Sequence, residues 1–487
     1  MNIEVRNQEP KEVWNMFADL NAVPRPSKKE ERIIAFMVNF GKKLHLDTFV
    51  DSVGNVIIKK TATAGFENRK TVILQSHLDM VHQKNNETNF DFETEGIKMR
   101  VDGDWVTAKG TTLGADNGLG VAAIMAILAS KTIEHPNLEA LFTIDEETGM
   151  TGAMGLRANI LEGSILLNLD TEEDDEIGMG CAGGIDITAQ KNYKEEDTPK
   201  ESVAITITVK GLNGGHSGMD IHRGLGNANK IMNRILYNSA IKFDASIAEV
   251  IGGGLRNAIP RESTAIIILH SSLKDSFLSE TTLLIKKIKE ELIVVEKNLT
   301  IELEETELPK KTLNKVTQNE FLKAVYAALN GVFKMSTTIK DLVETSNNIA
   351  NITAKEGTIK IGCLTRSSSE SSKFDLANSI KSAFELAGFE VSLTGNYPGW
   401  EPNINSEILA ITADLYEKIN GKKAKVAACH AGLECGILGK NYPKVDMVSF
   451  GPTIRGAHSP DEKASISSTQ KFWKFLQEIL KNIPEKQ

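Results

Sequence analysis

The hydrophobic and polar positions of the first 170 residues form three similar runs. TVILQSHLDM (71–80), LEALFTIDEE (138–147) and SILLNLD (164–170) are each apolar until near their end, where acidic groups or a histidine follow. Short continuous apolar runs are typical of strands buried on both faces, as in a parallel sheet. VAAIMAILAS (121–130), between the first two runs, has the length and composition of a buried helix. This alternation, which continues to about residue 185, predicts a doubly wound α/β domain.

A helix start is predicted earlier in the chain. SKKE, from Ser27 to Glu30, matches a capping box in front of an apolar-periodic run. The end of the chain, SSTQKFWKFLQEILKNI, has the pattern of an amphipathic helix.

The pattern changes after about residue 186. In VAITITVKG (203–211) apolar residues alternate with smaller or polar ones, which predicts a sheet with one face in water. Further helices are predicted after GLGNAN, within SETTLLIKKIKEELIVVEK and near residues 317–334, and strands in TAIIILHSS and TIKIGCLTRSS. The α/β pattern returns at about residue 397. We therefore expect an α+β domain at 187–397, inserted into an α/β domain formed by 1–186 and 398–487.

Length and charge narrow the class of protein. At 487 residues the chain exceeds what one hydrophobic core usually supports, so two domains are expected. The net charge of -9 argues against a nucleic-acid partner. The first residues, MNIEVRNQEPKEVW, lack the basic and apolar regions of a signal peptide, and no apolar stretch has the length of a membrane span. With four widely spaced cysteines, read as reduced thiols, this predicts a soluble cytoplasmic protein.

Candidate chemistry lies in short patches that follow the predicted strands or occupy glycine-rich turns. The residues are His77 and Asp79 in SHLDM, Asp116 in LGADNG, Glu146 and Glu147 in DEETG, Asp170 in NLDTEE, and His458 in GAHSPDE. Imidazoles and carboxylates are the ligands of a pair of zinc-like divalent ions, and parallel sheets bind ligands at the carboxyl ends of their strands. Since His458 has to join residues from the first 170 positions, the middle region is best explained as an insertion.

Each patch also has an ordinary structural explanation. His77 could be a core histidine beside a turn, Asp116 a helix N-cap, and His458 a turn residue. Glu146 and Glu147 could be solvated acids, and the acidic run Glu172–Glu176 is expected to be a solvated loop. What favours a metal site is that all the patches occur together.

The residues themselves suggest a division of roles. Asp116 is the best candidate for a ligand shared by two ions, because a carboxylate has two oxygens. Glu146 and Glu147 are adjacent, so in an extended segment their side chains would diverge, and one could bind metal while the other moves a proton. Their spacing does not decide which does which. Asp170 ends an apolar run, where an unpaired carboxylate would be costly to bury without a cation.

These patches closely resemble the PepD-type dipeptidases of the M20 metallopeptidase family. The motifs are SHLDMVHQK, GTTLGADNG, DEETGMTGAMGL, NLDTEE, GGHSGMDIHRGLGNA, HAGLECG and GAHSPDE, and the likeness covers nearly the whole chain. The resemblance implies a two-zinc catalytic domain interrupted by a lid domain that mediates dimerisation.

The resemblance also implies roles for individual residues. The metal ligands would be His77, Asp116, Glu147, Asp170 and His458, with Asp116 bridging the ions. Glu146 would then be the general base and Asp79 would orient His77. A cis peptide bond is implied between Asp116 and Asn117.

In the lid, the resemblance implies substrate-binding roles. His216 of GGHSG would stabilise the oxyanion, donated across a dimer in relatives, and Asn257 and Arg366 would bind the substrate carboxylate. Alternatively, His216 could be an ordinary turn residue, Asn257 a loop residue and Arg366 a surface residue. Many simpler M20 amidohydrolases have an arginine where this chain has His270, which leaves Arg366 as the candidate. Glu434 could receive a substrate's ammonium group or be structural.

The expected function is that of a cytoplasmic metal-dependent dipeptidase. It would hydrolyse short unblocked peptides, Xaa-His and other dipeptides, with a metal-activated water, and it would form a homodimer through the lid. Zinc fits the donor set, although cobalt or manganese would fit too. The alternatives are an N-acyl amino acid amidohydrolase of the same family and a non-catalytic binding module.

Overall fold

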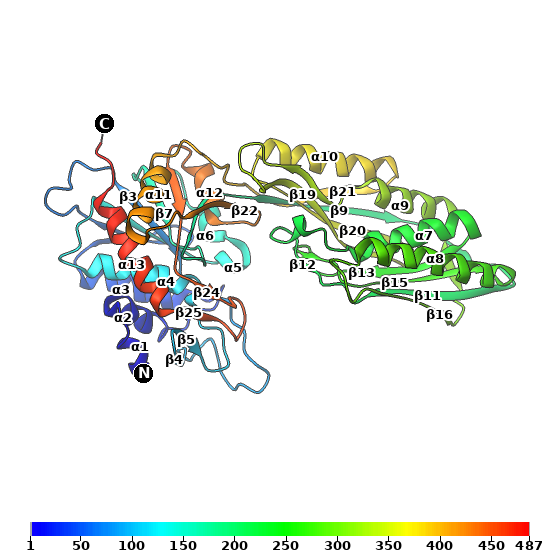
Figure 1. Ribbon diagram of the computed structural model, residues 1–487, viewed down its shortest axis with the longest axis horizontal. Coiled ribbons are helices and arrows are strands. Elements are labelled where there is room, and N and C mark those ends of the chain that lie inside the picture. Colours follow the sequence, from blue (N-terminus) through cyan, green and yellow to red (C-terminus); the bar gives the residue numbers. More distant parts are fainter. Residues whose placement is uncertain (1, 487) are drawn as a thin grey trace. The chain divides into compact units, whose positions relative to one another are not determined.

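The computed structural model describes residues 2–486 and divides into two compact units (Figure 1). The first unit contains the chain up to Gly180, Trp400–Ala428 and the chain from Leu433 onward. The second unit contains Cys181–Gly399 and Cys429–Gly432. The domain boundaries expected from the sequence, 186/187 and 397/398, lie close to this division. The catalytic and lid roles given to the two parts remain predictions.

The first unit is built on an eight-stranded sheet. In spatial order its strands are β1 (Asp47–Val50), β2 (Val56–Lys60), β6 (Leu138–Thr143), β3 (Val72–His77), β7 (Ile165–Asn168), β23 (Asp446–Ser449), β8 (Glu176–Cys181) and β22 (Lys425–Cys429). β3, β6 and β7 are buried along their whole length, as their apolar runs predicted. The strands β6, β3, β7 and β23 are parallel. The predicted α/β class is confirmed.

Helices cover this sheet. They are α1 (Ile3–Arg6), α2 (Lys11–Leu20), α3 (Glu31–Lys43), α4 (Ala115–Ala129), α5 (Glu146–Gly149), α6 (Thr151–Gly155), α11 (Glu407–Asn420), α12 (Glu434–Asn441) and α13 (Ile466–Lys481). α4 packs on β3 and α2, and it is buried along nearly its whole length. α11 packs on β23 and on α13, whose buried face includes Phe472 and Leu476. The buried helix and the amphipathic C-terminal helix were both predicted correctly.

The direction of the strand connections reverses between β3 and β7. From β3 the chain passes through α4 to β6 on one side, whereas from β7 it later reaches β23 on the other side. Ligands bind to parallel sheets beyond the carboxyl ends of strands at such a switch point. Because Gln75 pairs with Asn168, His77 and Asp170 reach the same level at this edge.

One predicted helix start was wrong. α3 begins at Glu31, and its N-cap residue is Glu30, without a side-chain capping bond. Ser27 does not cap the helix, because its Oγ donates to Oδ2 of Asp79 at 2.8 Å. The Ser27 hydroxyl therefore binds the buried carboxylate of Asp79 instead of the first turn of the helix.

A small antiparallel sheet positions the loop that carries His458. Its strands are, in order, β24 (Ile454–Arg455), β25 (Lys463–Ser465), β5 (Trp105–Ala108) and β4 (Met99–Asp102). β24 and β25 form a hairpin with His458 in its loop, and β25 pairs with β5. Since β5 comes shortly before Asp116, this pairing brings two distant parts of the sequence together.

The second unit is an antiparallel sheet with helices on one face. In order, its strands are β16 (Thr300–Thr306), β11 (Ser202–Lys210), β15 (Ser263–His270), β13 (Ser246–Gly252), β19 (Val343–Lys355), β20 (Thr358–Ser367), β9 (Gly183–Asn192) and β21 (Glu390–Tyr397), with β18 (Gly331–Met335) beside β19. Short pairs are formed by β10 (Glu195–Asp197) with β17 (Lys311–Leu313), and by β12 (Gly215–His216) with β14 (Ala258–Ile259).

The helices of this unit share one hydrophobic core with the sheet. They are α7 (Ala228–Phe243), α8 (Lys274–Leu292), α9 (Lys315–Ala327) and α10 (Glu370–Leu386), together with the 3-10 helices η1 (Ile221–Arg223) and η2 (Ser271–Leu273). Ile205 and Ile207 of β11 lie in this core with Ile235, Phe277 and Phe384 of the helices. The alternation of β11 thus predicted a one-sided sheet correctly.

The helix expected near residues 317–334 is shorter in the structure. α9 ends at Ala327, and Gly331–Met335 form strand β18.

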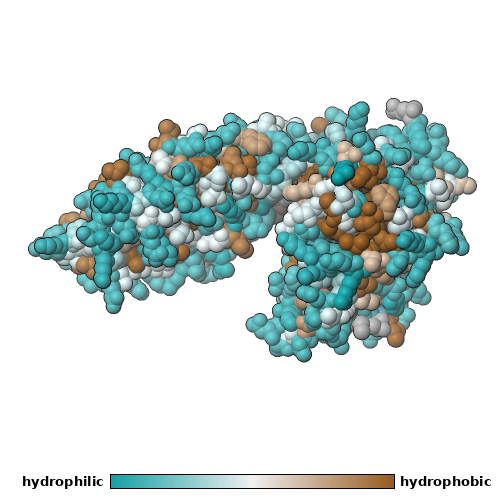
Figure 2. Space-filling model, turned by 180° about the vertical axis from the view of Figure 1, so that it is seen from behind, coloured by the Kyte–Doolittle hydropathy of each residue, from teal (hydrophilic) through white to brown (hydrophobic). Residues whose placement is uncertain are grey.

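Figure 2 shows hydrophilic residues over most of the surface in view, with hydrophobic residues gathered in one area of the first unit. Across residues 2–486, none of the helices has both the length and the hydropathy of a membrane span.

Candidate metal centre

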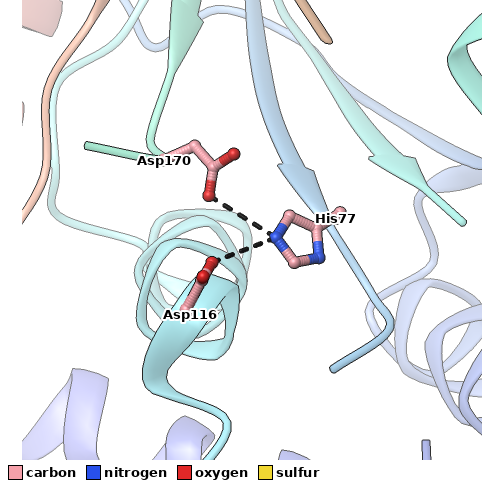
Figure 3. A group of neighbouring side chains, drawn as sticks. All are labelled: His77, Asp116 and Asp170. Carbon is pink, nitrogen blue, oxygen red and sulfur yellow. Dashed lines mark hydrogen bonds and ion pairs between the residues drawn. The ribbon is translucent and has the colours of Figure 1, made fainter. Parts of the chain in front are cut away.

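Three of the predicted ligands meet at the carboxyl edge of the first unit's sheet. His77 is the last residue of β3, Asp170 follows β7 by two positions, and Asp116 lies at the start of α4 (Figure 3). Nε2 of His77 is 3.2 Å from Oδ1 of Asp116 and 3.5 Å from Oδ1 of Asp170. The switch point of the sheet therefore gathers an imidazole and two carboxylates.

A second group forms on the other oxygen of Asp116. Oδ2 of Asp116 lies 3.2 Å from Nε2 of His458, and Oε2 of Glu147 lies 3.0 Å from the same nitrogen. Asp116 thus offers one oxygen to each group. The backbone at Asp116 departs from helical values, with φ -81° and ψ 111°, and the Asp116–Asn117 peptide is cis, as predicted.

Glu146 and Glu147 belong to a helix rather than to an extended segment. They begin α5, so the expectation that their side chains diverge as in a strand was wrong. Atoms of both glutamates nevertheless lie within 4.8 Å of each other and of His77. Oε1 of Glu147 is buried and has no hydrogen-bond partner among the described residues.

Asp79 lies behind His77, where an orienting group was expected. Oδ1 of Asp79 is 3.4 Å from Nδ1 of His77, and the Asp79 carbonyl oxygen is 3.2 Å from it. The backbone N–H of Glu146 donates to Oδ1 of Asp79 at 3.0 Å. Asp79 therefore contacts both the imidazole and the segment that carries the two glutamates.

The separations within the two groups fit bound divalent ions. Nitrogen and oxygen atoms at the corners of a tetrahedron around a zinc-like ion would be roughly 3.3 Å apart, given metal bonds of about 2.0–2.1 Å. The measured distances between imidazole and carboxylate atoms run from 3.0 to 3.5 Å. The buried Oε1 of Glu147, which has no hydrogen-bond partner among the described residues, is an atom that a bound cation would satisfy. The donor set and its spacing are suited to two metal ions that share Asp116.

The charges of the centre shift its pKa values strongly. Burial raises the pKa of Asp170 to about 6, with a further increase from the carboxylates of Asp116 and Glu147. Burial likewise raises the pKa of Glu146 well above its ordinary value. Hydrogen bonds that the His458 ring donates to the carboxylates of Asp116 and Glu147 raise the pKa of His458 to about 11. The negative charges of these clustered carboxylates favour the binding of cations.

Two further buried carboxylates near this centre were not assigned from the sequence. Glu462 is 2 % exposed and accepts hydrogen bonds from backbone N–H groups of the turn that leads to Asp116. Glu434 is fully buried, and its Oε2 accepts from Gln75 and Thr143 at 2.6 Å each. Glu434 had been left with two alternative roles, whereas PDE is too short a motif to have identified Glu462.

The acidic run after Asp170 is more ordered than expected. Its first residue, Glu172, is largely buried, and burial raises its pKa to about 8. The other four residues form ion pairs with Arg455, Lys471, Lys422 and Lys425. The expectation of a solvated loop therefore holds for Glu173 and Asp175, whose side chains are 48% and 50% exposed, but not for Glu172.

The predicted lid residues form a cluster of their own in the second unit. Arg366 is 4 % exposed and donates to the Tyr397 hydroxyl at 2.8 Å, and its Nη2 is 3.4 Å from Nε2 of His216. Asn257 has an exposed side chain, and its carbonyl oxygen accepts from the N–H of Ser217 at 2.7 Å. The structure thus brings His216, Arg366 and the backbone of Asn257 into one neighbourhood.

His216 and His270 differ in what their rings contact. Nδ1 of His216 accepts from the N–H groups of Gly218 and Met219 at 3.2 and 3.1 Å, which favours a proton on Nε2 of the neutral ring. Burial lowers the pKa of His216 to about 4, with a contribution from Arg366. His270 is exposed, and its ring accepts from the N–H of Ser272 at the start of η2. That contact gives His270 a local structural role.

Comparison with known proteins now gives the family. The sequence model of the family described as Peptidase family M20/M25/M40 matches residues 73–482 of the chain. The chain belongs to the M20 peptidase family. As predicted, this M20 peptidase is an enzyme, a hydrolase acting on peptide bonds.

Full-length relatives extend the comparison. The M20 peptidase is 43% identical over 483 residues to the cytosol non-specific dipeptidase of Escherichia coli (strain K12), covering 99% of this chain and 100% of that protein. The crystal structure of aminoacylhistidine dipeptidase from Vibrio alginolyticus matches with a TM-score of 0.93 at 44% identity, over 99% of each chain. The aminopeptidase PepT from Bacillus cereus, at 16% identity and a TM-score of 0.57 over 98% of this chain and 99% of that one, shares the fold.

Proposed function

We propose that this M20 peptidase is a metal-dependent dipeptidase that hydrolyses the peptide bond of short unblocked peptides, Xaa-His dipeptides among them. The observation that carries the proposal is the shared carboxylate of Asp116, with one oxygen toward His77 and the other toward His458. The full-length likeness to two proteins named as dipeptidases supports the substrate class. The first unit would be the catalytic domain and the second the lid.

The metal ligands in this proposal are two imidazoles and three carboxylates. They are His77, Asp116, Glu147, Asp170 and His458, holding two divalent ions that we take to be zinc, with cobalt or manganese as alternatives. When bound, such ions polarise a carbonyl oxygen and lower the pKa of a water molecule.

The side chains of the protein then move the proton and hold the site in shape. Glu146 takes the proton from the attacking water and passes it to the leaving amine. Its burial and elevated pKa suit a group that must carry a proton for part of the cycle. Asp79 fixes the ring of His77 through Nδ1 and the position of Glu146 through its backbone N–H.

Substrate recognition is assigned to residues of the second unit. Arg366 and Asn257 bind the carboxylate at the end of a dipeptide, since the planar guanidinium offers two parallel donors to such a group. His216 donates its Nε2 proton to the oxygen that becomes negative in the transition state. The contacts of its Nδ1 with two backbone N–H groups support that tautomer.

The proposal extends to assembly and location. The E. coli relative is named as a cytosol protein, which supports a cytoplasmic location. The homodimer expected from the family resemblance would form through the second unit. Light scattering of the purified enzyme tests this: twice the mass of 53.3 kDa is expected, and a monomer at micromolar concentration would contradict it.

A panel of matched substrates tests the function. Metal-free enzyme, prepared with a chelator, is re-supplied with zinc, cobalt or manganese and assayed on free dipeptides and on their N-acetylated forms. Hydrolysis of the free forms only after metal addition is expected. Preference for the acetylated forms would indicate an N-acyl amino acid amidohydrolase instead. No hydrolysis of either series would favour a non-catalytic binding module.

A further inference from the structure

Glu462 occupies the start of helix α4. Its Oε2 accepts from the N–H groups of Leu113 and Gly114 at 2.7 and 2.8 Å. Its Oε1 accepts from those of Ala115 and Asp116 at 2.7 and 3.2 Å. A helix start leaves such N–H groups without partners inside the helix, and a negative charge is stabilised there. One side chain therefore binds the whole turn that presents Asp116.

Arg25 holds the same turn through its carbonyl groups. Nη2 of Arg25 donates to the carbonyl oxygen of Gly114 at 2.5 Å, and Nη1 donates to those of Leu78 and Asp79 at 3.0 Å each. The side chain is 1 % exposed. Gly114 has φ +69°, and a Cβ there would lie 2.6 Å from Nη2 of Arg25, so this approach requires glycine.

These contacts join the segments that carry the proposed ligands. Glu462 lies four residues after His458, so it connects that loop to the Asp116 turn. Arg25 connects the same turn to the segment that follows His77. The two side chains carry opposite charges, which offsets part of the cost of burying them.

We propose that Glu462 is a positioning residue of the metal centre, which fixes Asp116 relative to His458 before any ion binds. This inference rests on the proposed metal-dependent function. Several carboxylates in one cluster repel each other, so without such a support the Asp116 turn would move apart and binding would have to reorder it. Partners of this kind, behind the direct ligands, typically change metal affinity by about 10–100-fold.

A purely structural role for Glu462 makes a different prediction. In that case its loss would lower the stability of the fold and leave metal affinity unchanged. Glu139 provides the matched control in the same unit, because it is also 2 % exposed and its Oε2 accepts from the N–H groups of Glu162 and Gly163 at 2.8 Å each. None of the proposed ligands lies in that turn.

The test compares Glu462→Gln with Glu139→Gln and the unmodified enzyme. Glutamine keeps the size of the side chain, but its amide nitrogen would face two of the turn's N–H groups. Zinc and cobalt affinities are measured on metal-free proteins against a competing chelator, with melting temperatures alongside. We expect Glu462→Gln to bind at least one ion about tenfold or more weakly, and Glu139→Gln to lose stability with unchanged affinity.

The outcomes separate this inference from the proposed function. If the unmodified enzyme binds neither ion, the metal-dependent function fails and the inference with it. If it binds both, and Glu462→Gln binds them equally well, only the positioning role is overturned.

A second measurement uses the unmodified protein and does not depend on a variant folding. In the metal-free state, the N–H groups of residues 113–116 should exchange with deuterium as slowly as those inside α4. Fast exchange that slows only when metal is added would show that the turn is not held beforehand, which overturns the inference.

Discussion

Oδ2 of Asp116 lies 3.2 Å from Nε2 of His458, although 342 positions separate the two residues in the chain. The contact depends on strand pairing. β25 pairs with β5, which comes shortly before Asp116 in the sequence, and the β24–β25 hairpin carries His458 in its loop. The second ion site therefore requires the C-terminal segment to fold onto the N-terminal one, so truncation before β24 would remove it.

Asp116→Asn should abolish most of the activity. The amide keeps the size of the side chain, but it has one acceptor oxygen and no negative charge to share between two ions. Loss of a direct shared ligand should cost more than the loss of a supporting partner, so kcat should fall by at least about 100-fold. Metal content, measured by mass spectrometry, should fall below two ions per chain. Two retained ions with normal kcat would contradict the bridging role.

The local sequence around the ligands explains why the site could be predicted. His77 and Asp170 end apolar strands, and parallel strands place their carboxyl ends at one edge, so pattern alone brought these two together. The C-terminal strand order, which brings in His458, has no such local signal. His458 was included because its patch occurs together with the others, and the motif resemblance then implied its role as a ligand.

Other features depend on tertiary contacts that no local pattern encodes. Glu462 has four backbone partners more than 340 positions away, and nothing in PDE distinguishes it from a solvated acid. Ser27 fits a capping box by sequence, yet its hydroxyl has a better acceptor in the buried Asp79. Glu146 and Glu147 start a helix of only four residues, which is too short to leave a periodic signal.

Glu146→Gln should separate proton transfer from metal binding. Glutamine cannot take a proton from water, and general acid–base catalysis is typically worth about 10²–10⁴-fold. We expect a loss of that size in kcat on a free dipeptide, with both ions still bound, because Glu147 is the proposed ligand. Metal analysis of the same preparation is the control. Near-normal turnover would refute the assignment of Glu146 as the base.

Arg366→Lys should raise KM for dipeptides with a free carboxyl end. Lysine keeps the charge but loses the paired donors that suit a carboxylate. We expect kcat/KM on a dipeptide to fall by about tenfold or more, since each lost charged hydrogen bond is worth about 1.5–3 kcal/mol. The C-terminally amidated dipeptide lacks the group concerned, so its kcat/KM should change much less.

The control variant for this position is Arg234→Lys. Arg234 is a partly exposed arginine of the second unit, and its guanidinium donates two hydrogen bonds to Glu291. Its replacement should leave both substrates unaffected. Equal losses on the free and amidated dipeptides in Arg366→Lys would show that Arg366 does not recognise the carboxylate.

His430 should make the protein less stable as the pH falls. Burial lowers the pKa of His430 to about 3, with contributions from Arg366, His216 and His222. The unfolded chain takes up a proton below its ordinary pKa of 6.5, whereas the folded protein does not until about pH 3. The contribution of neutral His430 to the free energy of unfolding is therefore fully present above pH 6.5, and it is lost progressively as the pH falls toward 3. At pH 5 the loss from this residue should be about 2 kcal/mol.

His430→Asn tests this by comparing urea unfolding of the variant and the unmodified protein at pH 7 and pH 5. Asparagine cannot be protonated, and its side chain can still meet the hydroxyl of Ser346, which lies 2.8 Å from Nε2 of His430. The variant should lose less stability than the unmodified protein between the two pH values, whatever its stability at pH 7. An equal loss in both proteins would mean that His430 is protonated in the folded state at pH 5, and that burial does not keep it neutral.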